Sequence, residues 1–454
     1  MEWQKVTTVV AAVVVVTAGA AACSSSKKSG GSSSGAPTLT GNCAQFQAYA
    51  GHSGKTVSMN GSILSPESDS LNKSWAEFSQ CTGITIQYTG SNSFESQLPV
   101  KVAGGNAPNL AIIPQPGLLQ SMVKTGKVKK PPAGVVTNED NWNAAWKGYG
   151  SVNGTFYAAP MSANMKTMVW YSPKYFTAHG YQVPTTWADV VTLSNKMATD
   201  MAASGGKPWC GGIGSGTASG WPATDWLEEA VLGSLGGQVY DDWISHKVKF
   251  ASPQIEGAMQ LVKSWMQNPA WVNGGYGDVK TIASTTFQNA GLPILKGKCA
   301  MLQQASFYQA QWPKGTTVNA TGDVSAFYMP PMNPAISKPV EGGGEFVAAF
   351  ADDGATQAVQ TYLSSPQWVE SRVKVAPGWV SANTKVDQSL YVNVIDKLSA
   401  KYLADPSATF RFDASDAMPA AVGSGAEWAA MVDWFANGKS IDSVAKQIDA
   451  AWPN

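Results

Sequence analysis

Three polar side chains follow the first three predicted strands of the chain, close to the point where each strand ends. The strands are predicted from short apolar or alternating runs at residues 56–60, 84–88 and 110–113. Helical patterns separate these runs, so the strands should be parallel, and such sheets bind ligands beyond their carboxyl ends. We therefore expect Glu67, Glu95 and Gln115 to point into one crevice, where their oxygens could accept hydrogen bonds from hydroxyl groups. Glu67 has an alternative role as an early helix carboxylate that interacts with the helix dipole.

The segment 211–226 combines glycines with residues that could hold a ring-shaped, hydroxylated ligand. Its glycines, which let backbone approach a ligand closely, are Gly211, Gly212, Gly214, Gly216 and Gly220. Trp221 could cover an apolar ring face and Asp225 could accept hydroxyl protons, whereas Trp226 is expected in the core. A glycine-rich loop before a helix can also bind phosphate, but no lysine follows at the required position and the Walker pattern is missing.

The composition of the chain limits its partners. The 31 basic and 31 acidic residues give a formal net charge of zero and form no long run of either sign. This balance argues against nucleic acid and against an anionic membrane face as partners. Charged residues make up only 14% of the chain, whereas tryptophan occurs 18 times. Many flat, amphipathic rings suit a ligand with apolar faces and a hydroxylated rim, as carbohydrates have.

The first residues of the chain predict export and a lipid anchor. Lys5 precedes an apolar run at 9–22 that ends in three alanines before Cys23. Small residues directly before a cysteine are typical of a bacterial lipobox, so we expect a signal peptide at 1–22, a lipidated Cys23 and a flexible Ser/Gly-rich tether at 23–42. The alternatives are an ordinary secretory signal with an incidental cysteine, or a short membrane anchor.

Four further cysteines predict two disulfides, because an even number is typical of exported proteins. Three pairings are possible, and sequence proximity favours Cys43 with Cys81 and Cys210 with Cys299. A metal site is the alternative, but no cysteine lies near a histidine at ligand spacing. The three scattered histidines are expected to be structural or surface residues, and we expect neither a metal nor a cofactor.

With its leader removed, the chain keeps about 430 residues, which predicts about two domains. From about residue 163 longer helical patterns replace the strand–helix alternation, at 187–201, 226–235, 253–267, 355–363 and 366–375. A strand is predicted at 325–329, and the three glycines at 342–344 favour a second crossing back to the first domain. Glu345 follows these glycines directly, where both domains would meet.

Seven segments that arrive in order give the chain a resemblance to a known family. They read GSILSPESD, CTGITIQYTGSNSFESQLPVKVAGGNAPNLAIIPQPG, NGTFYAAP, KPWCGGIGSGTASGWPATDWLEE, NGGYGDVKTIASTTFQNAGLPILKGKCAM, EGGGEFVAAF and RFDASDAMPAAV. The chain resembles extracellular solute-binding lipoproteins of carbohydrate ABC importers, in the α-glucoside-binding branch. The resemblance spans about residues 43–453 and includes all four cysteines.

The resemblance implies an α/β fold with two lobes, a cleft between them and a few crossing segments. We expect the first lobe at 43–162 plus 324–375 and the second at 163–323 plus 376–454. The resemblance also implies that Trp379 is an aromatic platform and that Arg411, Asp413 and Asp416 face the cleft, where an Arg–Asp pair suits a vicinal diol. A packing role is the alternative for Trp379, and a surface salt-bridge cluster is the alternative for the other three.

The expected function is that of the substrate-binding component of an ABC importer, which captures an α-glucoside or related oligosaccharide and delivers it to permease subunits. Such a protein would have no catalytic residues, would act as a monomer and would be held by lipid on the extracytoplasmic face of the cell membrane. One alternative is a secreted, lipid-anchored glycoside hydrolase, which needs two carboxylates opposed across one bond. The single G-x-S-x-G match, at 31–35, falls in the tether and reflects composition alone. A purely adhesive or sensory lipoprotein is the other alternative.

Overall fold

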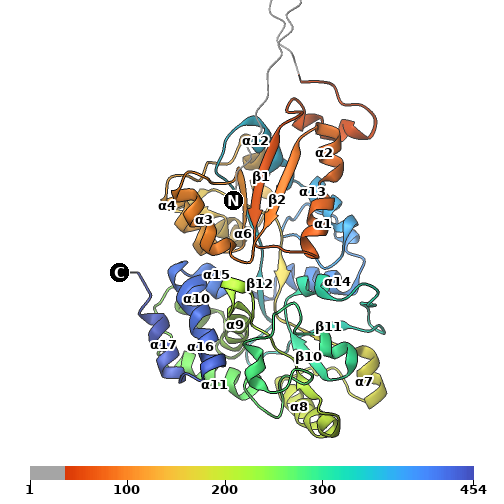
Figure 1. Cartoon of the computed structure of the whole chain (residues 1–454), viewed down its shortest axis with the longest axis vertical. Helices are drawn as coiled ribbons and strands as arrows, with labels where there is room; N and C mark the ends of the chain where they lie inside the picture. The colour runs from red at the N-terminus through yellow and green to blue at the C-terminus, as the bar shows by residue number, and fades with distance from the viewer. Residues whose placement is uncertain (1–35, 454) are drawn as a thin grey trace, which may run out of the picture. The chain divides into compact units, whose positions relative to one another are not determined.

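A five-stranded sheet forms the first lobe, in the upper half of Figure 1. The computed structural model describes residues 36–453, so the predicted signal peptide and Cys23 lie outside the described residues. The strands run in the order β2 (Thr85–Gly90), β1 (Thr56–Gly61), β3 (Leu110–Ile113), β13 (Phe346–Ala349) and β6 (Ala159–Pro160). β1 pairs in parallel with β2 and β3, as the helical connections predict, and β13 runs antiparallel between β3 and β6. The main helices of this lobe are α1 (Glu67–Ser74), α2 (Ala76–Thr82), α3 (Phe94–Ala103), α4 (Pro116–Lys124), α12 (Gly354–Leu363) and α13 (Pro366–Val375).

A four-stranded sheet forms the second lobe, in the lower half of Figure 1. Its order is β11 (Ser325–Tyr328), β8 (Met168–Tyr171), β10 (Cys299–Gln303) and β9 (Lys207–Trp209). β8 is antiparallel to both neighbours, and β9 and β10 are parallel. The main helices are α8 (Trp187–Met201), α9 (Trp221–Leu235), α10 (Gly237–Ile244), α11 (Pro253–Met266), α16 (Trp428–Asn437) and α17 (Ile441–Asp449). Tryptophan rings fill much of this core, and Trp226 is among them, as predicted.

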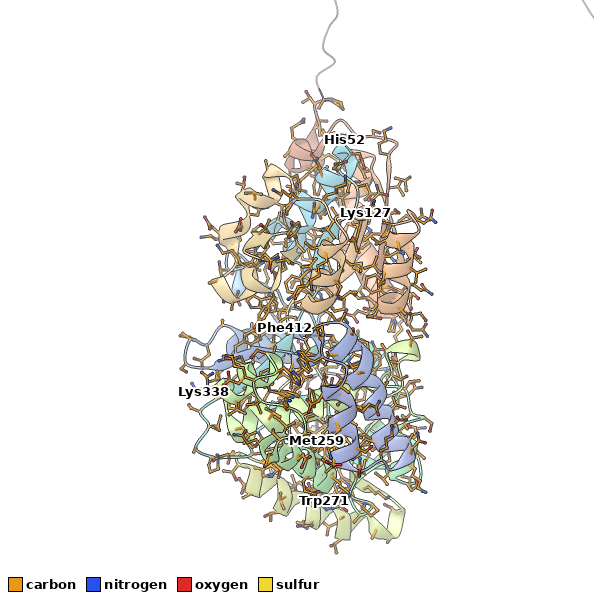
Figure 2. All side chains as sticks on the ribbon, turned by 90° about the vertical axis from the view of Figure 1, so that its left-hand side faces the viewer. His52, Lys127, Met259, Trp271, Lys338 and Phe412 are labelled. Atoms are coloured by element: carbon orange, nitrogen blue, oxygen red, sulfur yellow. A yellow bond between two sulfur atoms is a disulfide. The ribbon has the colours of Figure 1, made fainter. Side chains whose placement is uncertain are left out.

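A three-stranded sheet lies at the waist between the lobes, in the order β14 (Thr409–Phe412), β12 (Pro339–Gly343) and β7 (Asn164–Met165). The chain passes between this sheet and the first-lobe sheet three times, from β6 to β7, from β12 to β13 and, through residues 350–408, from β13 to β14. The predicted crossing at the three glycines is therefore present. In Figure 2 Phe412 lies at this waist, below His52 and Lys127 and above Met259 and Trp271.

Two segments lie in a different lobe from the one expected. β11 pairs with β8 in the second-lobe sheet, although a boundary at residue 324 would assign it to the first lobe. Conversely Trp379, Val380 and Tyr391 pack in the core of the first lobe, although residues after 375 were expected in the second. Both errors concern long-range pairing and burial, which local strand and loop patterns do not specify.

Capping residues explain where several helices begin. Thr186 and Asp189 form a capping box at the start of α8, and the Ser365 hydroxyl accepts from the backbone N–H of Trp368 at the start of α13. Both helices have the predicted limits. By contrast α9 begins five residues earlier than its helical pattern predicted, after Gly220, whose φ of 110° favours glycine. Residue 221 therefore lies in the first turn of a helix rather than in a loop.

Both predicted disulfides are present. One joins Cys43 to Cys81, with a Cα–Cα distance of 5.1 Å, and the other joins Cys210 to Cys299, at 5.8 Å. The second one connects the residue after β9 to the first residue of β10. Among the helices of residues 36–453, none combines the length and the apolar character that a membrane span requires.

Candidate functional site

A cavity lies between the two lobes and is lined by residues from both. It offers about 140 Å³ of space to the centres of water molecules. Seven of the ten predicted ligand-binding residues line it, namely Glu67, Glu95, Gln115, Trp221, Glu345, Asp413 and Asp416. Two of the three crossing segments contribute Asn164, Lys166, Gly343 and Gly344. The α/β topology therefore brings the loops after β1, β2 and β3 to one place, as the sequence predicted.

The first-lobe wall of the cavity consists of Glu67, Glu95, Gln115 and Glu345. The Gln115 side-chain amide donates to Glu95 Oε1 over 3.4 Å. Glu95 Oε2 and Gln115 Oε1 are buried and have no hydrogen-bond partner. Buried acceptors without a partner are costly, so this wall is ready to accept hydrogen bonds from a ligand.

Burial changes the acid–base behaviour of this first-lobe wall. Desolvation raises the pKa of Glu67 to about 7, although the nearby Arg372 guanidinium opposes the shift. Desolvation and the Glu67 carboxylate together raise the pKa of Glu345 to about 8. Desolvation also raises the pKa of Glu95. Glu67 and Glu345 therefore exchange protons near neutral pH, where unperturbed carboxyl groups are fully ionised.

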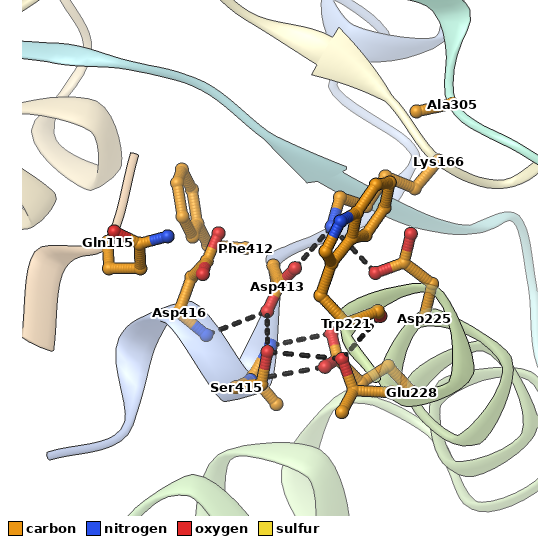
Figure 3. A network of polar contacts seen from close by, with 12 residues as sticks. Gln115, Lys166, Trp221, Asp225, Glu228, Ala305, Phe412, Asp413, Ser415 and Asp416 are labelled. Atoms are coloured by element: carbon orange, nitrogen blue, oxygen red, sulfur yellow. Dashed lines mark hydrogen bonds and ion pairs between the residues drawn. The ribbon is translucent and has the colours of Figure 1, made fainter. Parts of the chain in front are cut away.

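The second-lobe wall is organised around Lys166 (Figure 3). Its ammonium binds Asp225 Oδ1 over 2.8 Å and also binds Asp413 Oδ2. Asp413 is the N-cap of the short helix α15 (Ala414–Ala417), and its Oδ1 accepts from the Asp416 backbone over 2.7 Å and from the Ser415 hydroxyl over 2.9 Å. Each oxygen of Asp413 is thus fixed by at least one donor.

Buried carboxyl groups crowd behind this second-lobe wall. The buried carboxyl groups that interact electrostatically with Lys166 or with one another are Asp225, Glu228, Glu229, Glu341, Asp413, Asp416 and Glu427. Burial alone would lower the pKa of Lys166, but Asp225 and Asp413 outweigh burial and raise it well above the usual lysine value. Desolvation raises the pKa of Asp225 to about 7 and that of Glu229 to about 8. Burial thus opposes ionisation of Asp225 and Glu229, because many neighbouring charges are costly in a dry interior.

Four of these carboxylates could be considered as ligands for a hard cation such as Ca²⁺. Oxygens of Asp225, Glu228, Glu341 and Asp413 lie within 4.8 Å of one another. The Lys166 ammonium already binds two of the four, so the cluster contains its own cation.

Aromatic rings form a further part of the lining. The ring of Trp221 packs edge-to-face against Phe287, with centroids 4.9 Å apart, and lies 6.0 Å from Phe307. Trp428 also lines the cavity and donates from its indole nitrogen to the Ser415 hydroxyl over 3.2 Å. Such rings can cover the apolar faces of a hydroxylated ligand while the acidic groups accept its hydroxyl protons.

Three of the predicted ligand-binding residues do not line the cavity. Asp225 is 1% exposed and serves as an ion-pair partner of Lys166. Trp379 packs edge-to-face on Trp368 in the core of the first lobe, with Arg372 over its ring, so the packing alternative describes it. Arg411 forms two hydrogen bonds, of 2.6 and 2.8 Å, with Asp241, as in the salt-bridge alternative.

Sequence reasoning missed Lys166, Asn164, Phe287, Phe307 and Trp428. One signal could have found Lys166, because it is the only charged residue between Lys147 and Lys174. A lone charge in an apolar stretch needs a buried partner. The phenylalanines carry no comparable signal, because they lie in irregular segments far apart in the chain.

The lobes touch at the rim of the cavity. The backbone N–H and the hydroxyl of Thr217 both donate to the Asn92 carbonyl oxygen, over 3.2 and 3.0 Å. Gly117, near the start of α4, lies so close to Met418 that a Cβ there would overlap the Met418 carbonyl oxygen. The structure therefore holds the two lobes closed over the cavity.

Two α/β lobes that close over a polar and aromatic cavity define a ligand-binding protein of the periplasmic-binding type. The chain belongs to the family of bacterial extracellular solute-binding proteins, which matches residues 64–370. It is similar to the alpha-glucosides-binding periplasmic protein AglE of Rhizobium meliloti, at 35% identity over 85% of this chain and 84% of the relative. It is also similar to the osmoprotective compounds-binding protein GgtB of Synechocystis, at 31% identity over 88% and 93% of the two chains.

Solved structures share the fold. The bacterial solute receptor AcbH, described with a preference for β-D-galactopyranose, matches with a TM-score of 0.74 at 17% identity, over 88% of this chain and 98% of the receptor. A maltose-bound binding protein of T. maritima matches with a TM-score of 0.66 at 17% identity, over 87% and 98% of the two chains. At this identity the likeness shows the two-lobed fold alone.

Proposed function

We propose that this protein captures an α-glucoside or a related oligosaccharide in the cavity between its lobes and delivers it to the permease of an ABC importer. One observation carries the ligand class: the cavity combines hydrogen-bond acceptors on both lobes with a cluster of aromatic rings. Saccharides present hydroxyl donors along their rims and apolar C–H faces, so both kinds of lining group find partners. The similarity to an alpha-glucosides-binding protein supports the α-glucoside class.

The charge of the cavity argues for a neutral ligand or a donor-rich one rather than for phosphate. Among the described residues, Lys166 is the only lysine or arginine that lines the cavity, and two carboxylates already bind it. The glycine-rich loop therefore offers no free cation to a phosphate group.

Ligand capture involves closure of the lobes. Carboxyl groups of the first-lobe wall face the cavity opposite Trp221 and Asp413, so one ligand can contact both walls only when the lobes are closed. A ligand that prefers the closed form shifts an open–closed equilibrium by that preference. The contacts between Asn92 and Thr217 would then form on closure.

The remaining partners follow from the family and from the first residues of the sequence. We propose permease subunits as the docking partner, a lipid anchor at Cys23 and a monomer on the extracytoplasmic face. The protein has no catalytic role in this proposal, because its relatives are binding proteins and its acids hold hydroxyl groups.

Isothermal titration tests the ligand class. The protein without its signal peptide is titrated with maltose, trehalose, sucrose and unrelated sugars. We expect saturable heat with at least one α-glucoside, together with a change in tryptophan fluorescence, because Trp221 and Trp428 line the cavity. Absence of heat and of a thermal shift with every saccharide would refute the proposal.

Incubation with α-glucosides separates this function from the hydrolase alternative. We expect no release of glucose over hours at high protein concentration. Steady release that follows the protein through purification would identify a glycoside hydrolase instead.

A further inference from the structure

Lys166 occupies an unusual place at the boundary between the crossing segments and the second lobe. It directly follows β7, and its side chain is 6% exposed. Its ammonium reaches one carboxylate on α9, that of Asp225, and one at the start of α15, that of Asp413. Lys166 thereby connects three parts of the structure that are distant in sequence.

The two carboxylates that bind Lys166 differ in one respect. Both are almost completely buried, but only Asp413 lines the cavity. Asp413 Oδ1 is held by backbone and hydroxyl donors from α15, whereas a hydrogen bond from Lys166 holds Oδ2. The Asp413 carboxylate is thus held from two sides, by α15 at one oxygen and by the lysine at the other.

The acidic groups around Lys166 and Asp413 strengthen the dependence of the Asp413 carboxylate on the lysine. The acidic groups that face Lys166 and Asp413 from the surrounding elements are Asp225, Glu228, Glu229, Glu341, Asp416 and Glu427. Glu341 is fully buried, and neither of its oxygens has a hydrogen-bond partner. Without the ammonium, Asp413 would have no countercharge among the other buried acids, so its carboxylate would turn toward other donors.

Lys166 also contacts the aromatic lining. Its ammonium lies 5.5 Å from the centroid of the Trp221 ring, within the range of a cation–π interaction. The Lys166 side chain therefore contacts an acidic group and an aromatic ring that both line the cavity.

We propose that Lys166 is a positioning residue for ligand binding, which fixes the Asp413 carboxylate in the arrangement that a saccharide recognises. This inference rests on the proposed function and extends it to a residue outside the predicted ligand contacts. Its action on the ligand passes through Asp413, so the effects of the two residues on affinity should not be independent.

A double-mutant cycle measured by titration calorimetry tests the inference. The variants are Lys166→Met, Asp413→Asn and the double variant, each compared with the unmodified protein. We expect Lys166→Met to weaken binding about 10- to 100-fold, as loss of a charged hydrogen-bond partner does. In the Asp413→Asn background, Lys166→Met should weaken binding less than about threefold, because the carboxylate through which Lys166 acts is already absent.

Lys174→Met is the matched control, because it removes an ion-paired lysine whose partner, Asp323, lies away from the cavity. Its affinity should stay within about threefold of the unmodified protein. Lys166→Arg keeps a cation and should recover most of the affinity that Lys166→Met loses. If Lys166→Met does not fold, Lys166→Gln takes its place in the cycle.

The outcomes separate this inference from the proposed function. Additive losses in the cycle, or an unchanged affinity of a folded Lys166 variant, would overturn the positioning role while leaving saccharide binding intact. An unmodified protein that binds no saccharide would instead overturn the proposed function.

Discussion

The two walls of the cavity are built in different ways. The carboxylates of the second-lobe wall sit in a dense network, in which Asp413 accepts from Lys166, Ser415 and the Asp416 backbone. In the first-lobe wall the Glu95 and Gln115 side chains share one long hydrogen bond and each leaves one buried oxygen without a partner. Asp413 of the second-lobe wall is thus preorganised at both oxygens, whereas Glu95 and Gln115 of the first-lobe wall keep spare acceptors.

This difference suggests that the two walls act at different stages of ligand binding. A preorganised wall loses little conformational freedom when a ligand docks, so it supplies affinity at low cost in entropy. A wall with unpaired buried acceptors gains most when ligand hydroxyl groups reach it, which happens only on closure. The second-lobe wall would hold the ligand in the open form, and the first-lobe wall would favour the closed form.

Gly117→Ala should have the largest effect, because it prevents the first-lobe wall from reaching the ligand. The added Cβ would overlap the Met418 carbonyl oxygen of the second lobe. We expect affinity to fall on the order of 100-fold, since the competent closed form becomes rare, while alanine leaves α4 itself stable. Calorimetry measures the affinity, and thermal unfolding of the ligand-free protein checks the fold. Gly257→Ala in α11, where a Cβ meets no neighbour, is the control and should bind normally.

Trp221→Ala removes one of the two indole rings that line the cavity and should weaken binding about 10- to 100-fold. Trp379→Ala should instead leave affinity within about threefold of that of the unmodified protein. It should lower the free energy of unfolding by about 3–5 kcal/mol, because this ring packs in the first-lobe core. Calorimetry and chemical denaturation of both variants distinguish the two roles. A large loss of affinity for Trp379→Ala, in a protein that remains folded, would contradict the cavity described above.

Glu345→Gln should change how stability depends on pH. The pKa of Glu345 is about 8 in the folded protein against 4.5 as its usual value, mainly because of desolvation. Between these values the folded state binds more protons than the unfolded state, so the ligand-free protein should lose stability as pH rises from about 5 to about 8. Glutamine at position 345 does not titrate, so the melting temperature of the variant should fall less steeply as pH rises. An equal decline in both proteins would show that Glu345 does not carry a raised pKa.

Arg411→Ala should have the smallest effect. Its partner Asp241 is 45% exposed, and exposed ion pairs contribute at most about 1 kcal/mol to stability. We expect affinity within about threefold of the unmodified protein, because Arg411 does not line the cavity. A tenfold loss measured by calorimetry would mean that this arginine swings into the cleft in the liganded form.

Local sequence patterns predicted the elements of the fold well, because periodicity and caps act over a few residues. The limits of α8 and α13, the parallel strands of the first lobe and both disulfides are as expected. The lobe membership of β11 was wrong, since no local pattern states which strand it will pair with. Trp379 was misplaced for a related reason, because an amphipathic ring suits a core and a cleft equally well.

The candidate site was predictable where residues follow strand ends and not where distant loops meet. Glu67, Glu95 and Gln115 come from three successive strand–helix turns, so topology alone brought them together. The network around Lys166 unites residues from β7, α9 and α15, and only the tertiary structure shows that one ammonium serves two of its carboxylates. Phe287 carries no local signal, and the lone charge of Lys166 in an apolar stretch does not name its partners.

The disulfide between Cys210 and Cys299 makes the stability of the second lobe depend on the redox conditions around the protein. It joins the residue after β9 to the first residue of β10, where the two strands already pair and the Cys210 N–H donates to the Met301 carbonyl oxygen. Such bonds form outside the cytoplasm, where thiols are no longer kept reduced. The second lobe should therefore gain the stability of this cross-link only after export of the chain.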